Sequence, residues 1–439
     1  MLLPQDILDM PRMLFRALAF YSRSQFWNTA QIHTYQDRML RRLIQQANDH
    51  VPYYRRLFAD IGLQVNKFRG RVDMHKIPLL DKETLRLHTS EFIAANADQL
   101  GARWYQTSGS TGTPLSYILD TRSRYNDGAV TLRSYAWAGL YPGMKLFSVK
   151  DYLKQFTYKY SLGGRALSFD LNSLNLESAK LLWPKINALK PKVFRSYPFT
   201  LMMLYHYGQQ AGIPMHRPQK IITTGESLPQ ALRKKLETSY QAEVFDYYGM
   251  TENSSLITEC MAHTYHVIED YAFHEFLGPG LQPVRSGRAE IVATNLYNYA
   301  MPLIRYRTRD LAWLSPHTQT CPCGLAFRSV EKIEGRKEDY ILTPDGTRLN
   351  LIETPLNAGQ GITMAQYVQD AWDHMYVNIV PGPDFEPDSL QEVKKELRRL
   401  VGDRIGIDFH LVDRLEQRGK DGLGKIPFIY SKIGKSLYE

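Results

Sequence analysis

The stretch Tyr105-Gln-Thr-Ser-Gly-Ser-Thr-Gly-Thr-Pro114 concentrates hydroxyl side chains and glycines in a single short segment. Hydroxyl oxygens and unhindered backbone N–H groups in one turn suit the binding of a polyphosphate. The spacing is not that of the Walker loop, because no Lys-Ser/Thr pair follows the second glycine. Turns rich in Ser, Thr and Gly are more often ordinary surface turns, so the segments that follow it in the chain decide its meaning.

Length and composition indicate a globular enzyme of more than one domain. The chain has 439 residues, of which 44% are hydrophobic and 23% charged, and this length predicts two or more domains. The sequence contains no uninterrupted apolar run long enough to span a bilayer. Residues 1–28 lack the clean apolar core of a signal peptide. We expect them to form a helix docked on the protein's own core, rather than a helix lying in a membrane interface.

Charge and cysteine content narrow the partners and the location. The formal net charge of +9 suits acidic ligands such as ATP and CoA, but Lys and Arg are scattered. No basic run marks a nucleic-acid-binding arm, so we expect no nucleic-acid partner. Three cysteines in a chain of this size do not make a disulfide framework, which favours a reducing, cytoplasmic location. The oligomeric state is left open, with a homodimer as one option.

The distribution of patterns predicts an α/β protein. Residues 1–100 are mostly helical in pattern, and from about 120 to 300 short apolar runs alternate with helical stretches. Such alternation predicts layered sheets and helices with parallel strands. Near Gly335 the pattern changes to strand, charged amphipathic helix and strand. We therefore expect a large N-terminal domain over residues 1–337 and a small, mobile α+β domain over residues 338–439.

Five further segments accompany the Ser/Gly stretch along the chain. They are Thr224-Gly-Glu-Ser227, Tyr247-Tyr-Gly-Met-Thr-Glu252, Arg305-Tyr-Arg-Thr-Arg-Asp-Leu311, Glu334-Gly-Arg-Lys-Glu-Asp-Tyr-Ile341 and Gly424-Lys-Ile-Pro427. In this order they resemble the adenylate-forming superfamily, which joins a carboxylate to AMP and then passes the acyl group on. His50-Val-Pro-Tyr-Tyr-Arg55 and Ile77-Pro-Leu-Leu-Asp-Lys82 narrow the resemblance to the phenylacetate–CoA ligase family.

The resemblance implies a role for each segment in adenylation, which must neutralise and align two anions that repel each other. The outgoing pyrophosphate would be held by Thr107, Ser108, Gly109, Ser110, Thr111, Gly112 and Thr113. The α-phosphate would contact Thr251, and Glu252 would hold Mg²⁺, a hard cation suited to carboxylate oxygens. The nucleotide would be bound by Gly225, Glu226, Tyr248, Gly249, Asp310 and Arg336, with Asp310 accepting both ribose hydroxyls.

The resemblance also implies a catalytic lysine and a hinge residue. Lys425 lies in a glycine-flanked turn, and in the family a lysine there bridges carboxylate and phosphate oxygens. The hinge between the domains would lie at Glu338, where the family usually has Asp. That departure, and the stretch after it, look more like the branch associated with capsular polysaccharide synthesis and with deazaflavin-coenzyme synthetases. In that branch the acceptor is often not established.

The cysteines suggest a second site, near residues 260–323. Cys260, Cys321, Cys323 and one histidine would complete the tetrahedral shell of a structural zinc. The spacing before Glu269-Asp270 favours His266 over His263, and some members of the family carry such a site. Three separate buried cysteines are the alternative interpretation.

The leading hypothesis is an enzyme that activates a small carboxylic acid with ATP and Mg²⁺ and makes an acyl-CoA thioester. A second is acyl transfer to an amine, or nucleotidyl transfer, in polysaccharide or specialised metabolism. A third is a degenerate binding or scaffold protein. The presence of Glu252, Asp310, Arg336 and Lys425 argues against the third. The identity of the acid cannot be read from the sequence.

Overall fold

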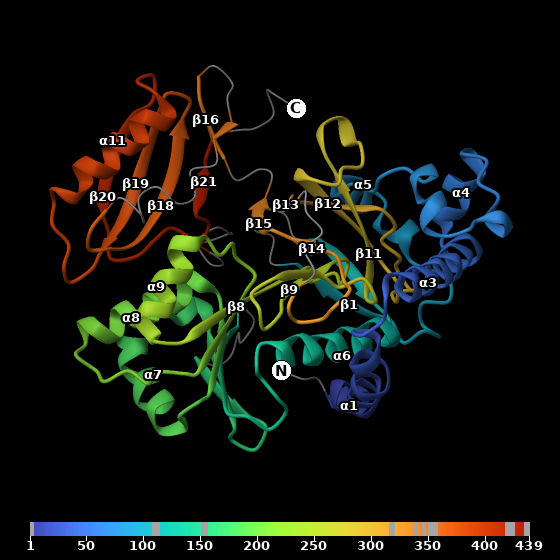
Figure 1. The fold of residues 1–439 in the computed structure, drawn as a ribbon, viewed down its shortest axis with the longest axis horizontal. Coiled ribbons are helices and arrows are strands. Elements are labelled where there is room, and N and C mark those ends of the chain that lie inside the picture. The colour runs from blue at the N-terminus through green and yellow to red at the C-terminus, as the bar shows by residue number, and fades with distance from the viewer. Residues whose placement is uncertain are drawn as a thin grey trace. The chain divides into compact units, whose positions relative to one another are not determined.

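The computed structural model describes residues 4–107, 115–150, 157–315, 321–336, 340–344, 348–349, 359–417 and 426–433. The chain divides into two compact units. Unit 1 contains the described residues of Met1–Gly109, Thr113–Pro142 and Phe245–Glu334. Unit 2 contains the described residues of Gly143–Val244 and Gly335–Glu439. Figure 1 labels many of the helices and strands of both units, and each unit is described separately below.

Unit 1 begins with helices, as the sequence predicts. They are α1 (Pro4–Arg16), the π-helical turn η1 (Ala17–Tyr21), α2 (Ser22–Ser24), α3 (Thr29–His50), α4 (Pro52–Asp60), α5 (Lys82–Leu87) and the 3-10 turns η2 (Val65–Lys67), η3 (Arg71–Lys76) and η4 (Thr89–Phe92). A capping box starts α3, because Asn28 and Gln31 exchange side-chain-to-backbone hydrogen bonds of 3.0 Å. Pro52 stands in the first turn of α4, where its missing N–H costs nothing.

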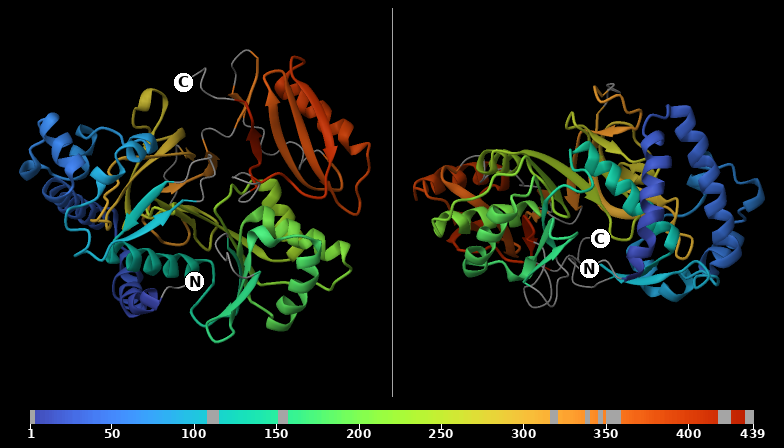
Figure 2. Two further views of the ribbon diagram at one scale, coloured as in Figure 1. Left: turned by 180° about the vertical axis from the view of Figure 1, so that it is seen from behind. Right: turned by 90° about the horizontal axis from the view of Figure 1, so that it is seen from below.

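The N-terminal helix packs on the protein, as we expected of residues 1–28. Figure 2 shows it (dark blue) beside α6 (Thr121–Trp137, teal). The Arg16 guanidinium donates to Asn126 of α6 at 2.8 Å. The Ser24 hydroxyl donates to Asp270, which is fully buried and also paired with Arg133. These buried polar contacts tie the first helices to the core.

Antiparallel strands complete unit 1. They are β1 (Arg103–Gln106), β2 (Ser116–Leu119), the end of β8 (Glu243–Gly249), β9 (Leu256–Glu259), β10 (Tyr265–Val267), β11 (Ala272–Leu277), β12 (Gly287–Asn295), β13 (Tyr306–Leu314), β14 (Ser329–Val330) and the start of β15 (Lys332–Arg336), with one 3-10 turn, η6 (Pro279–Leu281). The sheet orders are β1-β2, β14-β10-β9-β8 and β11-β12-β13-β15.

The parallel strands that the sequence predicts lie in unit 2, whereas the strands between residues 256 and 300, which we also expected to be parallel, are antiparallel. Its elements up to residue 244 are β3 (Leu146–Lys150), β4 (Tyr158–Ser161), β5 (Ala166–Asp170), the 3-10 turn η5 (Leu171–Ser173), α7 (Leu176–Leu189), β6 (Val193–Ser196), α8 (Pro198–Gln210), β7 (Lys220–Thr224) and α9 (Gln230–Tyr240). The order is β7-β6-β3-β5-β4. All neighbours are parallel except β4 and β5. Helices α7 and α8 form the crossovers from β5 to β6 and from β6 to β7, as parallel connections require.

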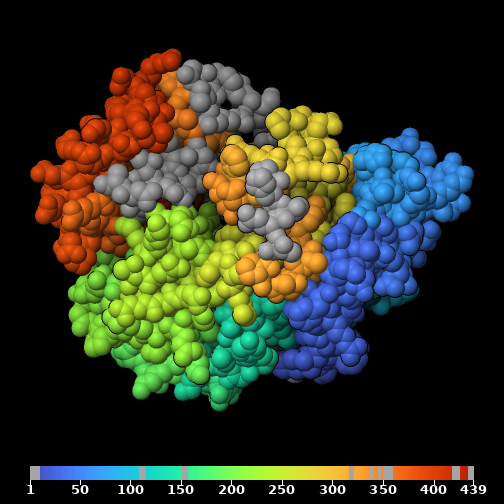
Figure 3. All heavy atoms as spheres, viewed as in Figure 1, coloured from blue at the N-terminus to red at the C-terminus, as the bar shows by residue number. Residues whose placement is uncertain are grey.

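The C-terminal part of unit 2 has a sheet of its own. Its elements are β16 (Ile341–Leu342), β17 (Arg348–Leu349), β18 (Ile362–Ala371), β19 (His374–Pro381), α11 (Ser389–Val401), β20 (Gly406–Leu411) and β21 (Ile429–Ser431). Four of them form the order β20-β19-β18-β21, and α11 covers one face, burying Val393, Leu397 and Val401 (Figures 1 and 2). In Figure 3 these residues form a continuous orange-to-red region of the surface.

The C-terminal sheet shares a hydrophobic core with the preceding part of unit 2. Buried side chains from residues 147–244 and from 341–429 belong to one cluster. The rings of Phe199 and Phe428 lie 5.7 Å apart, and the Lys235 ammonium donates to the Ile362 carbonyl. The compact units group residues 143–244 with residues 335–439, and the expected division into domains over residues 1–337 and 338–439 stays a prediction. Independent motion of residues 338–439 stays a prediction.

Candidate functional site

The two ends of the Ser/Gly stretch are joined in unit 1. Strands β1 and β2 form an antiparallel hairpin that pairs Gln106 with Ser116. One residue further on, the Thr107 N–H donates to the Leu115 carbonyl and the Leu115 N–H donates to the Thr107 hydroxyl, both at 2.9 Å. Ser108, Gly109, Ser110, Thr111, Gly112 and Thr113 lie outside the described residues. Their contact with pyrophosphate stays a prediction.

The same hairpin contacts the Thr-Glu segment that follows β8. The Tyr117 hydroxyl donates to the Thr251 carbonyl at 2.8 Å. The exposed Thr251 side chain donates to the Glu252 carboxylate at 3.3 Å, and Glu252 is 3% exposed. The structure therefore brings the Ser/Gly hairpin and the predicted α-phosphate and magnesium residues together. Sequence reasoning missed Tyr117, because its role depends on a pairing across 134 residues of chain.

Tyr248 and Asp310 form the best-defined pair of predicted nucleotide-binding residues. The Tyr248 hydroxyl, at the end of β8, donates to Asp310 on β13 at 2.7 Å. Burial and the negative charge of Asp310 raise the pKa of Tyr248 well above its ordinary value. The phenol thus stays neutral and keeps its proton for the carboxylate. The pair joins an aromatic ring to a carboxylate, and its contact with a nucleotide stays a prediction.

Glu226 makes a connection within unit 2 that the sequence did not predict. Strand β7 ends at Thr224, and Gly225 follows with a φ of +78°, which favours glycine. The Glu226 carboxylate accepts from the Ile426 N–H at 3.2 Å and from the Phe199 N–H at 3.4 Å. Phe199 lies in the first turn of α8, where a negative charge is stabilised. Glu226 therefore contacts the residue that follows Lys425 in the chain.

Gly335 packs closely on the same turn. Its φ is +93°, and a Cβ atom built there would lie 2.3 Å from the Ser227 hydroxyl oxygen. This close approach fixes the backbone just before Arg336, which is half-buried at the end of β15. The hinge candidate Glu338 and the catalytic candidate Lys425 lie outside the described residues. Their roles stay predictions.

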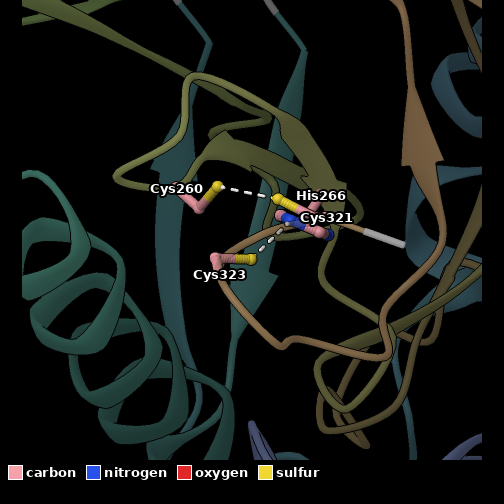
Figure 4. A group of neighbouring side chains, drawn as sticks. All are labelled: Cys260, His266, Cys321 and Cys323. Atoms are coloured by element: carbon pink, nitrogen blue, oxygen red, sulfur yellow. Dashed lines mark hydrogen bonds between the residues drawn. The ribbon is translucent and has the colours of Figure 1, made fainter. Parts of the chain in front are cut away.

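The three cysteines and His266 form one cluster in unit 1, drawn in Figure 4. Their ligand atoms all lie within 4.8 Å of one another. The Cys260 and Cys321 sulfurs are 3.6 Å apart, and the Cys323 sulfur lies 3.3 Å from His266 Nε2. His266 Nδ1 lies 3.1 Å from the Phe327 carbonyl, an arrangement that fixes the tautomer in metal-binding histidines. His263 instead stacks on Phe245, with the ring centroids 4.7 Å apart.

The electrostatics of the cluster suit a cation. Burial raises the pKa of the Cys260 thiol, but hydrogen bonds from His266 and from backbone N–H groups outweigh it and bring the pKa to about 6. Burial and the neighbouring Cys321 and Cys260 raise the pKa of Cys323 to about 12. Burial also raises the pKa of the Cys321 thiol, but hydrogen bonds from Thr264, Cys323 and His266 outweigh it and lower that pKa as well. Only the Cys323 thiolate is opposed on balance by burial and by its neighbours, a conflict that a bound divalent cation would relieve. Three sulfurs and one imidazole fit a closed tetrahedral zinc shell.

Known proteins resemble this chain in sequence. Residues 341–432 match the model of the CapK C-terminal domain. A phenylacetate–coenzyme A ligase of Thermus thermophilus is 27% identical over 71% of this chain and 72% of its own length. Protein CapK of Staphylococcus aureus is 21% identical over 78% of this chain and 77% of its own. The predicted resemblance to this ligase family and to its capsule-associated branch is confirmed.

A solved structure resembles the chain in fold. A 2-hydroxyisobutyryl-CoA ligase, solved in the postadenylation state with an acyl-AMP, superposes with a TM-score of 0.74 at 18% identity over 91% of both chains. The likeness confirms the predicted layered α/β fold. Among the described residues, no helix is both long enough and apolar enough to cross a membrane.

Proposed function

We propose that this chain is an AMP-forming ligase that activates a small carboxylic acid with ATP and then transfers the acyl group to CoA. The similarity to phenylacetate–coenzyme A ligases over 71% of the chain supports this reaction class. The observation that carries the proposal is the bond between Tyr248 and Asp310. This bond joins the ring of Tyr248, near the end of β8, to the buried carboxylate of Asp310 on β13. Thr251 and Glu252 follow β8 in the chain.

The reaction consists of two displacements. A carboxylate oxygen of the acid attacks the α-phosphorus of ATP, an acyl–AMP bond forms and pyrophosphate leaves. The CoA sulfur, having lost its proton to solvent, then attacks the acyl carbon, and AMP leaves. The first step brings two anions together, so its rate depends on cationic and hydrogen-bonding groups aimed at the phosphates.

The residues divide between binding and charge neutralisation. Asp310 would accept the ribose hydroxyls, and Tyr248 with Gly249 would lie against the adenine. In unit 2, Gly225, Glu226 and Arg336 are assigned by resemblance to the same nucleotide. Thr251 would donate to the α-phosphate, the hydroxyls of residues 107–113 would hold pyrophosphate, and Lys425 would bridge the carboxylate and the phosphate.

Magnesium and zinc have separate places in this proposal. Glu252 is a buried carboxylate beside a threonine hydroxyl, and its oxygens suit Mg²⁺, which would neutralise the phosphate charge. Cys260, His266, Cys321 and Cys323 would hold a structural zinc that stabilises the turns after β9 and β13. A closed shell leaves no open coordination position, so zinc would not take part in catalysis.

The alternative is an enzyme that passes the acyl group to an amine, or that transfers the nucleotide itself. The match of residues 341–432 to the CapK C-terminal domain motivates it, because in the capsule-associated branch the acceptor is often not established. The amide-forming alternative shares the first half-reaction with the ligase and differs in the acceptor, whereas a nucleotidyl transferase would pass AMP itself to its acceptor.

Two measurements test the proposal in order. Exchange of labelled pyrophosphate into ATP is measured across a panel of aliphatic, hydroxy and aromatic acids, and at least one acid should support it. The acyl-AMP of that acid is then supplied with either CoA or glucosamine. Thioester formation supports the ligase. Amide formation without thioester replaces it with the amide-forming alternative, and no exchange with any acid would contradict both acyl-transferring candidates.

A further inference from the structure

Gln366 lies in β18, inside the C-terminal sheet, and its side chain is fully buried. Its Nε2 donates to the carbonyls of Glu416 and Pro427, both at 2.8 Å. Its Oε1 accepts from the Glu416 N–H at 3.0 Å and from the Asn378 amide at 3.2 Å. The amide therefore makes all four of the hydrogen bonds that it can make.

The two carbonyls belong to opposite ends of one segment of chain. Glu416 precedes, and Pro427 follows, the ten residues 417–426, which include Lys425. Because one nitrogen donates to both carbonyls, the ends of this segment are held together at the reach of a single amide group. Residues distant in sequence thus meet at a side chain of the sheet interior.

Each end also has a second anchor. The Glu416 carboxylate accepts from the Tyr376 hydroxyl at 2.7 Å and pairs with Lys432 at 2.9 Å. At the other end, the Ile426 N–H donates to Glu226 at 3.2 Å. These contacts hold each end to the surrounding structure, whereas Gln366 connects the two ends to each other.

We propose that Gln366 is a positioning residue for Lys425: its buried amide fixes the ends of the segment that delivers the lysine charge to the phosphates. The inference rests on the proposed function, in which Lys425 acts in adenylation. A point charge on a flexible stem is effective only when its backbone is held in place, and a misplacement of about 1 Å can cost about 10²-fold in rate.

A merely structural role is the competing explanation, and the chain offers a matched control. Gln369 lies on the same strand and is equally buried. Its side-chain amide accepts a hydrogen bond from the Leu342 N–H at 2.9 Å and donates one to the Leu342 carbonyl at 2.7 Å. It does not bond to Glu416 or Pro427 in any described contact. Gln366→Met and Gln369→Met each keep the side-chain length and remove an amide of the same burial.

The first test is a double-mutant cycle on pyrophosphate exchange, measured well below the melting temperature with the best acid of the panel. Gln366→Met should lower kcat about tenfold or more and change the KM values less, while Gln369→Met should stay within about twofold of wild type. In a Lys425→Ala background, Gln366→Met should have less than about a twofold effect. The inference would be overturned if Gln366→Met lowered kcat by the same factor in the wild-type and Lys425→Ala backgrounds. It would also be overturned if Gln366→Met and Gln369→Met lowered kcat equally.

The second test needs no substrate. Limited trypsin digestion with mass spectrometry measures cutting after Arg418 and Lys420, which lie between the two anchored ends. Gln366→Met should accelerate these cuts relative to wild type and to Gln369→Met, and an unchanged rate would contradict the positioning role. If Lys425→Ala exchanges normally, the proposed role of the lysine fails. If Lys425→Ala loses exchange but Gln366→Met and Gln369→Met have equal effects on it, the further inference fails and the proposed function stands.

Discussion

The hydroxyl of Tyr248 donates to the carboxylate of Asp310 across 2.7 Å, although 62 residues of chain separate them. Tyr248 is the next-to-last residue of strand β8 and Asp310 lies in β13, which belongs to a different sheet. The bond orients the carboxylate and occupies one of its oxygens, Oδ2. Asp310 is the carboxylate that we propose for the ribose diol.

Removing this bond should weaken nucleotide binding. Tyr248→Phe keeps the ring and leaves Asp310 without the phenol, and a hydrogen bond to a charged group contributes about 1.5–3 kcal/mol. We expect KM for ATP in pyrophosphate exchange to rise roughly tenfold or more. Asp310→Asn should raise it further, because the charged acceptor is lost. An unchanged KM in both variants would remove the pair from the nucleotide site.

Lys425→Ala should abolish most adenylation and leave the fold intact. Loss of one charge aimed at the transition state should lower the exchange rate by about 10²-fold or more. Lys420→Ala removes a lysine from the same segment and serves as the control, with near-normal exchange. Thermal melting checks the fold of both variants. Normal turnover by the Lys425→Ala variant would contradict the proposed catalytic role of Lys425.

The purified protein should contain about one zinc per chain. Cys323→Ser should lose the metal and melt at a lower temperature, because binding of a structural metal contributes to folding. His263→Ala should retain the metal, since His263 stacks on Phe245 and does not belong to the cysteine–histidine cluster. Elemental analysis and thermal melting, with and without a chelator, provide the measurements. Metal-free protein of unchanged stability would exclude the site.

Glu338→Pro tests the predicted hinge. Proline fixes φ near −65°, which removes the backbone freedom that a change between two half-reactions needs. We expect pyrophosphate exchange to survive and transfer from supplied acyl-AMP to CoA to be suppressed. Glu338→Ala removes the charge without locking the backbone and should retain both activities. Equal loss of both activities in the proline variant would indicate misfolding instead of a blocked hinge.

Gly335→Ala should destabilise the protein more than Gly163→Ala. Both glycines have positive φ, +93° and +62°, but a Cβ at Gly335 would meet the Ser227 hydroxyl oxygen, whereas nothing lies within 4 Å at Gly163. Backbone strain of this kind costs roughly 1–3 kcal/mol. The free energy of unfolding in denaturant measures the difference. Equal losses would show that the contact with Ser227 adds nothing.

Much of the fold followed from local patterns. The alternation of apolar runs and helical stretches predicts layered sheets and helices, because each element must bury one face. The order of six short segments predicted the reaction class, and four ligand-type side chains predicted the cluster around His266.

The sequence by itself determined which chemical groups are present and in what order: the hydroxyl-rich stretch, the carboxylates Glu252 and Asp310, the lysine and the three cysteines. Only the tertiary structure decided which of them meet. The bonds of Tyr117 to Thr251, of Glu226 to Ile426 and of Gln366 to both Glu416 and Pro427 join residues 50 to 200 positions apart. No local pattern encodes such pairs, because they arise when separate strands and helices bury their apolar faces in a common core and leave their polar groups to satisfy one another.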